Sequence, residues 1–267
     1  MKKIILITGA TDGIGFETAK SMVLKGHHVI VHGRNPEKLK AVGEQLSNLE
    51  SSGFVESIIA DLSSIAAVKQ MISELKIRFD KLDVLINNAG VFATPAPVTS
   101  DKLDVRFVVN TYAPYLLATE LLPLLGATGR VVNLSSAAQS SVNLDAMSGL
   151  VEMSDREAYS QSKLAITMWS RLLGIKLKET GPMVVSVNPK SLLGSKMVRD
   201  AFGVAGSDLS VGVDILERAS FSEEFSRAHG LYFDNDLEQF SNPHPDALND
   251  EKSQKVVETM KRIIQAF

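Results

Sequence analysis

The chain has 267 residues, of which 45% are hydrophobic and 22% charged, and it contains no cysteine. This size and composition predict one compact α/β domain over residues 1–267, and the missing cysteine excludes disulfides, thiolate catalysis and cysteine-based zinc sites. The formal net charge of −3, with basic residues scattered among acidic ones, argues against a nucleic acid or an anionic membrane as a partner.

Apolar runs and histidines add no membrane segment and no metal site. The run Met1–Ile7 ends at Thr8, too early for a secretion signal, so it predicts a buried first strand. The run 115–125 is interrupted by Glu120 and Pro123 and cannot span a bilayer. The five histidines lack metal-ligand spacing, so no metal is expected. We therefore expect a cytoplasmic protein with no membrane insertion.

Short β-branched runs alternate with longer helical patterns along the chain. This alternation predicts a doubly wound, Rossmann-type domain with a central parallel sheet of about seven strands and helices on both faces. The predicted strands are Lys3–Thr8, His28–His32, Phe54–Ala60, Val84–Asn87, Arg130–Leu134, Val184–Asn188 and Leu231–Phe233. The predicted helices are Gly15–Lys25, Pro36–Leu49, Ile65–Phe79, Asp104–Leu124, Asp155–Thr180, Leu209–Ser220 and Asp250–Ala266.

A glycine-rich loop, Thr8-Gly9-Ala10-Thr11-Asp12-Gly13-Ile14-Gly15, joins the first predicted strand to the first helix. Glycines at these positions let the backbone turn tightly and bring N–H groups and the helix N-terminus against a pyrophosphate. In a doubly wound sheet, ligands bind at the carboxyl ends of the strands near the switch in strand order. The loop therefore predicts a dinucleotide site.

The second predicted strand is followed by Arg34, where sites for NAD usually place an acid that holds the ribose hydroxyls. A guanidinium group suits a phosphate instead, so Arg34 favours NADP (NADPH) over NAD. Asp12 in the glycine loop weakens this preference, because a basic residue there would help to bind the extra phosphate. A solvated Arg34 at a helix start is the alternative.

Tyr159 and Lys163 are four residues apart on a predicted helix and follow Ser135 and Ser136 in the chain. Residues at this spacing share one helix face, so the Lys163 ammonium is expected to lower the pKa of the Tyr159 phenol from its usual value of about 10. A phenol activated in this way donates and accepts protons near neutral pH. Combined with the glycine loop, this pattern is typical of a hydride-transfer site.

These motifs, in this order, resemble the short-chain dehydrogenase/reductase family over nearly the whole chain. The matching segments are the glycine loop, Asp61 with Leu62 after the third strand, Asn87-Asn88-Ala89-Gly90, Asn110, the serine strand 130–136, and Tyr159 with Lys163. The resemblance implies an oxidoreductase that interconverts an alcohol and a carbonyl group on a small molecule. The family often forms dimers or tetramers, so it also implies a homo-oligomer.

The resemblance implies a role for each residue of the catalytic set. Tyr159 would exchange a proton with the substrate oxygen, and Ser136, chosen over Ser135, would hydrogen-bond the same oxygen. Lys163 would bind the nicotinamide ribose and favour ionisation of Tyr159. Asn110 would anchor a water-linked proton relay, with a purely structural role as an equal alternative. Cofactor contacts would come from Thr8, Gly9, Thr11, Asp12, Gly13, Ile14, Gly15, Arg34, Asp61, Leu62, Asn88, Ala89, Gly90, Tyr159, Lys163, Pro189 and Ser195.

One position departs from the family pattern. The family has a glycine after Asn188-Pro189, and this chain has Lys190. A lysine there is expected to alter the turn or to project its ammonium toward solvent or the cofactor phosphates. Ser195 stands in for the threonine that the family uses to bind the carboxamide. Replacing Lys190 by glycine should therefore change the cofactor affinity.

Within the family the chain resembles the retinol-dehydrogenase-like branch, in its long segment between Ser136 and Tyr159, in Ser162-Lys163-Leu164-Ala165 and in Gly230-Leu231-Tyr232-Phe233. Two segments, 137–155 and 190–206, are expected to shape the substrate pocket, although they could also be ordinary surface loops. Their apolar residues favour a fairly apolar substrate or pack against the domain: Val142, Leu144, Met147, Phe202 and Val204.

Two other functions compete with the dehydrogenase. One is a sensor or scaffold protein that binds a dinucleotide and has lost catalysis, with Lys190 as the cause. The complete set of Asn110, Ser136, Tyr159 and Lys163 argues against it, because a binding module has no need for an activated phenol. The other is a sugar-nucleotide epimerase or dehydratase, which the glycine spacing and the absence of a large C-terminal domain disfavour.

Overall fold

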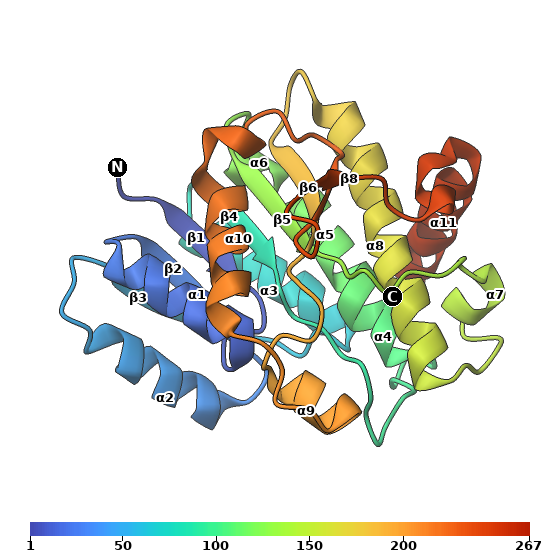
Figure 1. Cartoon of the computed structure of the whole chain (residues 1–267), viewed down its shortest axis with the longest axis horizontal. Helices are drawn as coiled ribbons and strands as arrows, with labels where there is room; N and C mark the ends of the chain where they lie inside the picture. The colour runs from blue at the N-terminus through green and yellow to red at the C-terminus, as the bar shows by residue number, and fades with distance from the viewer.

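The computed structural model describes residues 1–267 except for the side chain of Phe202. One eight-stranded sheet runs through the molecule in the order β3-β2-β1-β4-β5-β6-β7-β8, with helices on both of its faces (Figure 1). The strands are β1 (Ile4–Ile7), β2 (His28–Gly33), β3 (Phe54–Ile59), β4 (Val84–Asn87), β5 (Arg130–Leu134), β6 (Met183–Asn188), β7 (Tyr232–Asp234) and β8 (Gln239–Ser241). The predicted doubly wound α/β fold is confirmed.

The eighth strand was not predicted. β8 pairs antiparallel with β7, whereas all the other neighbouring strands are parallel. Gln239–Ser241 is only three residues long and contains no β-branched residue, so it carries no strand signal of its own. Its position next to β7 brings the turn 235–238 to the carboxyl end of the sheet.

The helices follow the predicted alternation with small changes at their ends. Their bounds are α1 (Gly13–Leu24), α2 (Pro36–Ser47), α3 (Ile65–Arg78), α4 (Val105–Phe107), η1 (Val108–Tyr112), α5 (Ala113–Glu120), α6 (Leu122–Leu125), α7 (Leu144–Met147), α8 (Asp155–Leu177), α9 (Lys196–Phe202), α10 (Leu209–Phe221), η2 (Glu223–Phe225), η3 (Pro245–Leu248) and α11 (Asp250–Gln265). The two segments expected as loops, 137–155 and 190–206, contain the short helices α7 and α9.

The helix predicted over Asp104–Leu124 is interrupted. A π-helical turn, η1, separates α4 from α5, and a break at Leu121 separates α5 from α6. Pro114 has no N–H group and cannot donate the α-helical bond to the carbonyl of Asn110 four residues earlier. The sequence prediction missed this interruption, although π-turns of this kind often occur at functional sites.

Two apolar clusters, one on each face of the sheet, hold the layers together. On one face α8 packs between the sheet and α11, which adds Val256 and Met260 to the cluster that contains Leu164. On the other face α1 packs beside α10. These layers bring the carboxyl ends of β1, β2, β4, β5 and β6 to one edge of the sheet.

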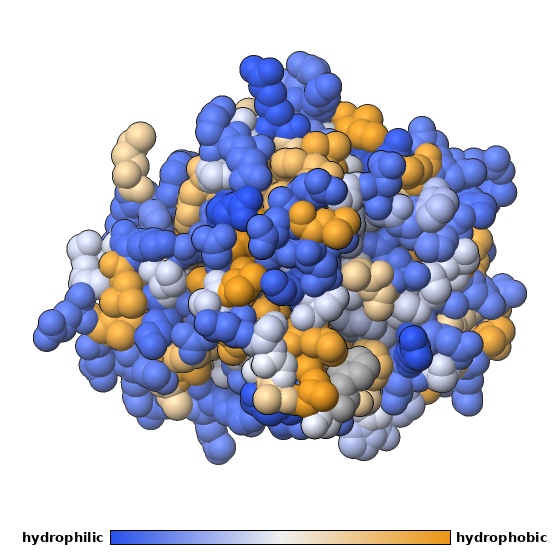
Figure 2. Space-filling model, viewed as in Figure 1, coloured by the Kyte–Doolittle hydropathy of each residue, from blue (hydrophilic) through white to orange (hydrophobic). Residues whose placement is uncertain are grey.

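Over the described residues, no helix combines the length and apolar character needed to cross a membrane. On the face shown in Figure 2, apolar residues lie in small groups among polar ones. The same described residues contain no cluster of three His, Asp or Glu side chains that could ligate a metal ion.

Candidate active site

Tyr159 on α8 faces Ser136, which follows β5. The two side chains are hydrogen-bonded, and the ring of Phe92 packs against the Tyr159 ring with 5.0 Å between the centroids. Burial raises the pKa of Tyr159, and the hydrogen bond with Ser136 opposes this with a smaller effect. The phenol is therefore protonated at neutral pH.

Lys163 lies one helical turn after Tyr159, as predicted, but the pKa of the phenol is raised overall and not lowered. Its Nζ is 5.6 Å from the centroid of the Tyr159 ring and donates to the carbonyl oxygen of Leu134 at 2.6 Å. Burial lowers the pKa of Lys163 itself to about 8. The prediction was wrong because removal of the phenol from water raises its pKa by more than the hydrogen bond with Ser136 lowers it.

Ser135 and Ser136 have different partners, although they are adjacent. The Ser135 hydroxyl is buried and donates to the carbonyl of Lys163 at 3.1 Å, and it also contacts the Thr167 hydroxyl at 2.6 Å. Ser135 therefore attaches β5 to α8, whereas Ser136 faces Tyr159. This arrangement supports the choice of Ser136 as the candidate catalytic serine.

Asn110 lies in the π-turn, and its side-chain amide is fully engaged. Its Oδ1 accepts from the N–H of Val91 at 2.8 Å, while Nδ2 donates to the Val91 carbonyl at 3.0 Å and to the Ser162 hydroxyl at 2.9 Å. The Ser162 hydroxyl donates in turn to the carbonyl of Tyr159 at 2.7 Å. The Asn110 side chain thus links the loop after β4 to the helix that carries Tyr159.

A buried chain of polar side chains lies beneath the site and includes Asn87 and Asn133, which the sequence analysis named as parts of family motifs, and Ser170, which it missed. Nδ2 of Asn87 donates to Oδ1 of Asn133 at 2.7 Å, and Nδ2 of Asn133 donates to the Ser170 hydroxyl at 2.8 Å. These bonds join β4, β5 and α8 below Lys163. Polar residues at buried strand and helix positions were the available signal, because such groups need partners.

The α4 and α8 helices are also held together by an ion pair. Arg106 is buried, and its guanidinium bonds to the carboxylates of Asp104 and Asp155. Asp155 begins α8 one turn before Tyr159, while Arg106 precedes Asn110 by one turn. The pair therefore keeps Asn110 and Tyr159 in register across the two helices.

The glycine loop adopts the backbone that its sequence predicts. Gly9 and Gly13 have positive φ angles of 65° and 56°. A Cβ atom at Gly15 would lie 2.3 Å from Nδ2 of Asn88, so only glycine fits there. A Cβ at Gly13 would meet only the Ser195 side chain, at 3.6 Å, which means that the loop presents open backbone beside Ser195. These features fit a dinucleotide phosphate held by N–H groups.

The ends of β1 and β4 lock this loop in place. The Thr8 hydroxyl accepts from the N–H groups of Asn88 and Ala89, each at 3.1 Å. Nδ2 of Asn88 donates to the carbonyls of Thr8 and Gly9 at 2.8 and 3.0 Å. Thr8 and Asn88 therefore bind each other. Gly90 follows two residues after Asn88, and a Cβ atom added to it would lie 3.7 Å from Nζ of Lys163.

The other residues of the loop have local roles. The Asp12 carboxylate caps α1 by accepting from the N–H of Gly13 at 2.6 Å. Thr11 packs against Gly33, where a Cβ would lie 2.5 Å from the Thr11 methyl group. Ile14 packs on the cluster between α1 and α10. All three lie at the predicted nucleotide-binding edge.

Arg34 is exposed at the end of β2 and, among the described residues, has no ion-pair partner. The Asp61 carboxylate is also exposed and accepts from the N–H and the hydroxyl of Ser63 at 2.9 and 2.8 Å. The Leu62 side chain is buried in the core. The structure thus leaves the Arg34 guanidinium available to an anionic ligand.

The segment after β6 reaches the glycine loop. Ser195 caps α9 by accepting from the N–H of Val198 at 3.3 Å. The carbonyl of Pro189 accepts from Nδ2 of Asn235 at 2.9 Å. Lys190, the residue that replaces the expected glycine, has a φ of 123°, so it retains a backbone conformation that favours glycine.

The apolar residues expected around a substrate behave differently from one another. Met147 is buried in the core, and Val142 and Leu144 pack against the same cluster. Val204 is 43% exposed. The side chain of Phe202 lies outside the described residues. The packing alternative therefore holds for the first three.

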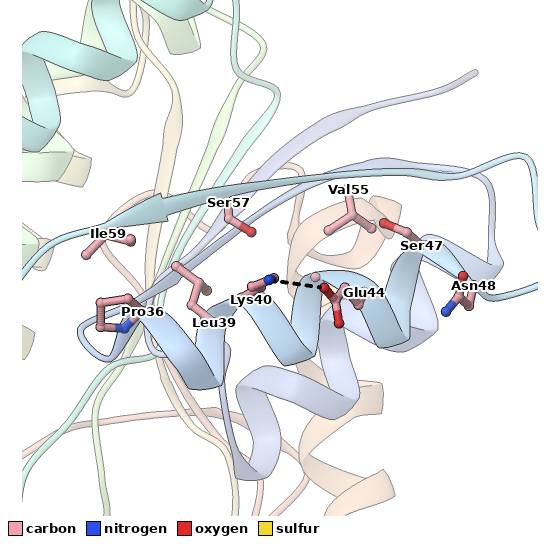
Figure 3. Close-up of a pocket in the computed structure, with 10 residues that line it drawn as sticks. Pro36, Leu39, Lys40, Glu44, Ser47, Asn48, Val55, Ser57 and Ile59 are labelled. Carbon is pink, nitrogen blue, oxygen red and sulfur yellow. Dashed lines mark ion pairs between the residues drawn. The ribbon is translucent and has the colours of Figure 1, made fainter.

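A hollow of about 490 Å³ lies between α2 and the edge strand β3 (Figure 3). Residues of these two elements line it, including Leu39, Lys40, Val55 and Ile59. None of the predicted site residues is among its lining residues. It is separate from the position of Tyr159.

The family model of short chain dehydrogenases matches residues 3–202. Human polyprenol dehydrogenase is 34% identical over 192 residues, which cover 69% of this chain and 58% of that protein. Human retinol dehydrogenase 13 is 27% identical over 98% of this chain and 84% of its own length. The chain thus spans little more than half of the first relative and most of the second.

Solved structures have the same fold. A structure from Mycobacterium paratuberculosis superposes with a TM-score of 0.81 at 24% identity, over 98% of this chain and 93% of the other. A short chain dehydrogenase from Escherichia coli CFT073, described as complexed with NADPH, has a TM-score of 0.68 at 27% identity, over 87% of this chain and 96% of the other.

Proposed function

The chain belongs to the short-chain dehydrogenase family, whose members are oxidoreductases that act on CH–OH groups, and from this premise we propose that it is an NADP-dependent enzyme that interconverts an alcohol with a ketone or aldehyde. The observation that carries the proposal is the meeting of Tyr159, Ser136 and Lys163 at the carboxyl edge of the sheet. A binding protein would not need a phenol, a hydroxyl and a buried ammonium in one place.

In the proposed reaction, Tyr159 holds the proton that the substrate oxygen gains or loses. Because its pKa is raised, the phenol is protonated at neutral pH and can donate to a carbonyl oxygen. Ser136 would donate a hydrogen bond to the same oxygen, and two such donors stabilise the negative charge that grows there. When bound, the nicotinamide dinucleotide supplies or accepts the hydride.

Lys163 would stabilise Tyr159 after its proton has left. With a pKa of about 8, the Lys163 ammonium is charged in most molecules at pH 7. A positive charge at this distance from the ring favours the phenolate. Asn110 would support return of the proton through its backbone carbonyl, which receives no α-helical bond from Pro114 and can bind water.

The glycine loop would hold the cofactor's phosphates through its free backbone N–H groups and the N-terminus of α1. Arg34 would bind the 2′-phosphate that distinguishes NADP from NAD, because its guanidinium is exposed and has no ion-pair partner in the described chain. Asp61 and Leu62 would flank the adenine. Gly90, Pro189 and Ser195 would border the nicotinamide. The NADPH-complexed relative supports this assignment.

The substrate would be a fairly apolar small molecule. Leu192 and Leu237 are 49% and 61% exposed, and the bond from the Ser191 N–H to Asp236 at 3.0 Å keeps their segments adjacent. Val204 adds a third exposed apolar side chain from the segment after β6. Polyprenol and retinol, which the names of two relatives mention, are alcohols of this apolar kind.

Oxidation of NADPH or NADH, followed at 340 nm with decanal, benzaldehyde and all-trans-retinal, tests the proposal. We expect NADPH consumption that the variant Tyr159→Phe abolishes, while its affinity for NADPH stays within a few-fold of the wild type. Turnover that survives Tyr159→Phe would refute the mechanism. Cofactor binding without turnover, in either direction, would favour the sensor or scaffold protein.

A further inference from the structure

The backbone carbonyl of Ser136 accepts two side-chain hydrogen bonds. The Tyr232 hydroxyl donates to it at 3.2 Å, and Nε2 of Gln139 donates at 2.9 Å. A carbonyl oxygen has two lone pairs, so these donors satisfy it fully. The peptide after Ser136 is therefore held by two side chains that the catalytic set does not include.

The orientation of this peptide sets the position of the Ala138 N–H, which donates to the Ser136 hydroxyl. Ser136 lies beyond the end of β5, where no sheet bond holds its carbonyl. Its Oγ accepts from the N–H of Ala138 at 3.1 Å, which leaves the O–H free to donate toward Tyr159. A rotated peptide would move the Ala138 N–H and remove the bond that holds the Ser136 Oγ in this direction.

The Tyr232 hydroxyl is buried and keeps the proton that it donates. Tyr232 lies on β7, level with Ser186 on β6, which is itself level with Asn133 on β5. Its side chain is 5% exposed. Burial, followed by the nearby carboxylates of Asp234 and Asp236, raises the pKa of Tyr232 well above its usual value. The phenol therefore keeps its proton wherever the protein is folded near neutral pH.

Gln139 connects the same carbonyl to the C-terminal part of the chain. Its Oε1 accepts from the N–H of His244 at 3.1 Å, and its side chain is also hydrogen-bonded to Tyr232. Its Nε2 lies 3.4 Å from the hydroxyl of Ser135. Tyr232, Gln139 and the Ser136 carbonyl thus form a closed set of hydrogen bonds.

We propose that Tyr232 and Gln139 are positioning residues, which aim the Ser136 hydroxyl at the oxygen it shares with Tyr159. The proposal rests on the proposed function of Ser136. It gives the Gly230-Leu231-Tyr232-Phe233 motif a chemical role, since Tyr232 acts on the reaction through Ser136 and does not touch the substrate itself.

A double-mutant cycle tests the coupling. Tyr232→Phe removes only the hydroxyl, and we expect kcat for NADPH oxidation with the fastest of decanal, benzaldehyde and all-trans-retinal to fall about three- to tenfold, the effect of one hydrogen bond, at unchanged NADPH affinity. In the background Ser136→Ala the same change should have no further effect. Gln139→Leu should behave like Tyr232→Phe.

A readout that needs no turnover accompanies the kinetics. The chain has four tyrosines, so ¹³Cζ-labelled tyrosine gives four resonances that single Phe variants assign. Ser136→Ala and Tyr232→Phe should shift the Tyr159 resonance in the same direction. Tyr112→Phe is the matched control, since the Tyr112 hydroxyl also donates to a backbone carbonyl, that of Met147, at 2.6 Å. Tyr112→Phe should lower the melting temperature of the protein and leave the Tyr159 resonance unshifted.

Three results would overturn the proposal. They are an unmoved Tyr159 resonance in Tyr232→Phe, an unchanged kcat, or a loss of equal size with and without the Ser136 hydroxyl. If Tyr159→Phe and Ser136→Ala retain full activity, the proposed function fails, and the Tyr159 resonance in Tyr232→Phe still decides whether Tyr232 orients Ser136.

Discussion

The imidazole of His32 accepts a hydrogen bond from the backbone N–H of Gly9, with 3.1 Å between Nδ1 and the nitrogen. Its other nitrogen, Nε2, is 3.1 Å from the carbonyl of Ala60, which can only accept. His32 is therefore neutral, with its proton on Nε2. It is 3% exposed and ties the glycine loop to the ends of β2 and β3.

Removal of this bond should weaken cofactor binding. We expect His32→Ala to raise the Kd for NADPH about two- to tenfold, the effect of one hydrogen bond, because Gly9 loses the acceptor that holds the loop. His32→Asn should recover much of the affinity, since its Oδ1 can replace Nδ1. Calorimetric titration with NADPH measures both, and equal affinities in wild type and His32→Ala would contradict this role.

The same histidine predicts a loss of stability in acid. Burial lowers the pKa of His32 from 6.5 to about 4, so the unfolded chain binds its proton first as the pH falls. Its stabilising contribution, on the order of 3 kcal/mol, is complete above about pH 6.5 and is lost toward pH 4. The melting temperature of His32→Asn should depend less steeply on pH in this window than that of the wild type.

Replacing Lys190 by glycine should make the protein more stable. A non-glycine residue with φ of 123° is strained by about 1–3 kcal/mol, and here the bonds from Ser191 to Asp236 hold the turn. Lys190→Gly should relieve this strain and raise the melting temperature by about 2–4 °C. Lys190→Ala keeps the Cβ and should bring no gain, so a similar rise in both variants would point to charge instead of backbone.

Lys190→Gly should also change the affinity for NADPH by several-fold, because the turn borders the proposed nicotinamide site. Lys190→Ala separates the loss of the ammonium from the change of the backbone. Identical NADPH affinities in wild type and both variants would remove Lys190 from the cofactor site.

Replacing Arg34 should weaken the preference for NADPH over NADH. Arg34→Ser should raise the Kd for NADPH at least tenfold, the effect of a charge-assisted bond to phosphate, and leave that for NADH nearly unchanged. Lys40→Ser is the matched control, because Lys40 is also an exposed cation and lies further along α2. If both variants lose the same NADPH affinity, general charge and not Arg34 would explain the preference.

The parts of the fold that the sequence predicted are those with strong local signals. The strands Val84–Asn87 and Arg130–Leu134 match to the residue, because each contains adjacent aliphatic residues and leads into a family motif. The π-turn at Asn110 and the strand β8 were missed. The π-turn follows a missing donor at Pro114, and β8 pairs with the neighbouring β7 although Gln239–Ser241 has no strand signal of its own, so hydrophobic periodicity reveals neither.

The sequence named the residues that meet at the candidate site, but it did not predict how burial shifts their pKa values. The motifs placed Tyr159, Lys163 and Ser136 together, since parallel strands end at one edge. The pKa of Tyr159 was predicted in the wrong direction, because spacing gives the distance between two groups and says nothing about how much water they lose. The contacts of His32, Gln139 and Tyr232 depend on strand order, which only the fold supplies.

Loss of the Lys163 proton should lower the activity at alkaline pH. The pKa of Lys163 is lowered from 10.5 to about 8 by burial, so its ammonium is lost as the pH rises through about 8. If the ammonium assists Tyr159, kcat/KM for carbonyl reduction should fall along a limb centred near pH 8, which reports the free enzyme. The limb from Tyr159 lies higher, because its pKa is raised above about 10.

Two variants assign this limb to Lys163. Lys163→Arg keeps the charge at every accessible pH and should remove the limb, while Lys163→Met should have low activity without it. The free energy of unfolding gives an independent check. Between pH 8 and 10.5 the unfolded chain keeps the Lys163 proton, whereas the folded protein loses it. The unfolding free energy of the wild type, relative to that of Lys163→Met, should therefore rise by up to about 3 kcal/mol over this range. A limb near pH 8 that persists in Lys163→Arg would belong to another group.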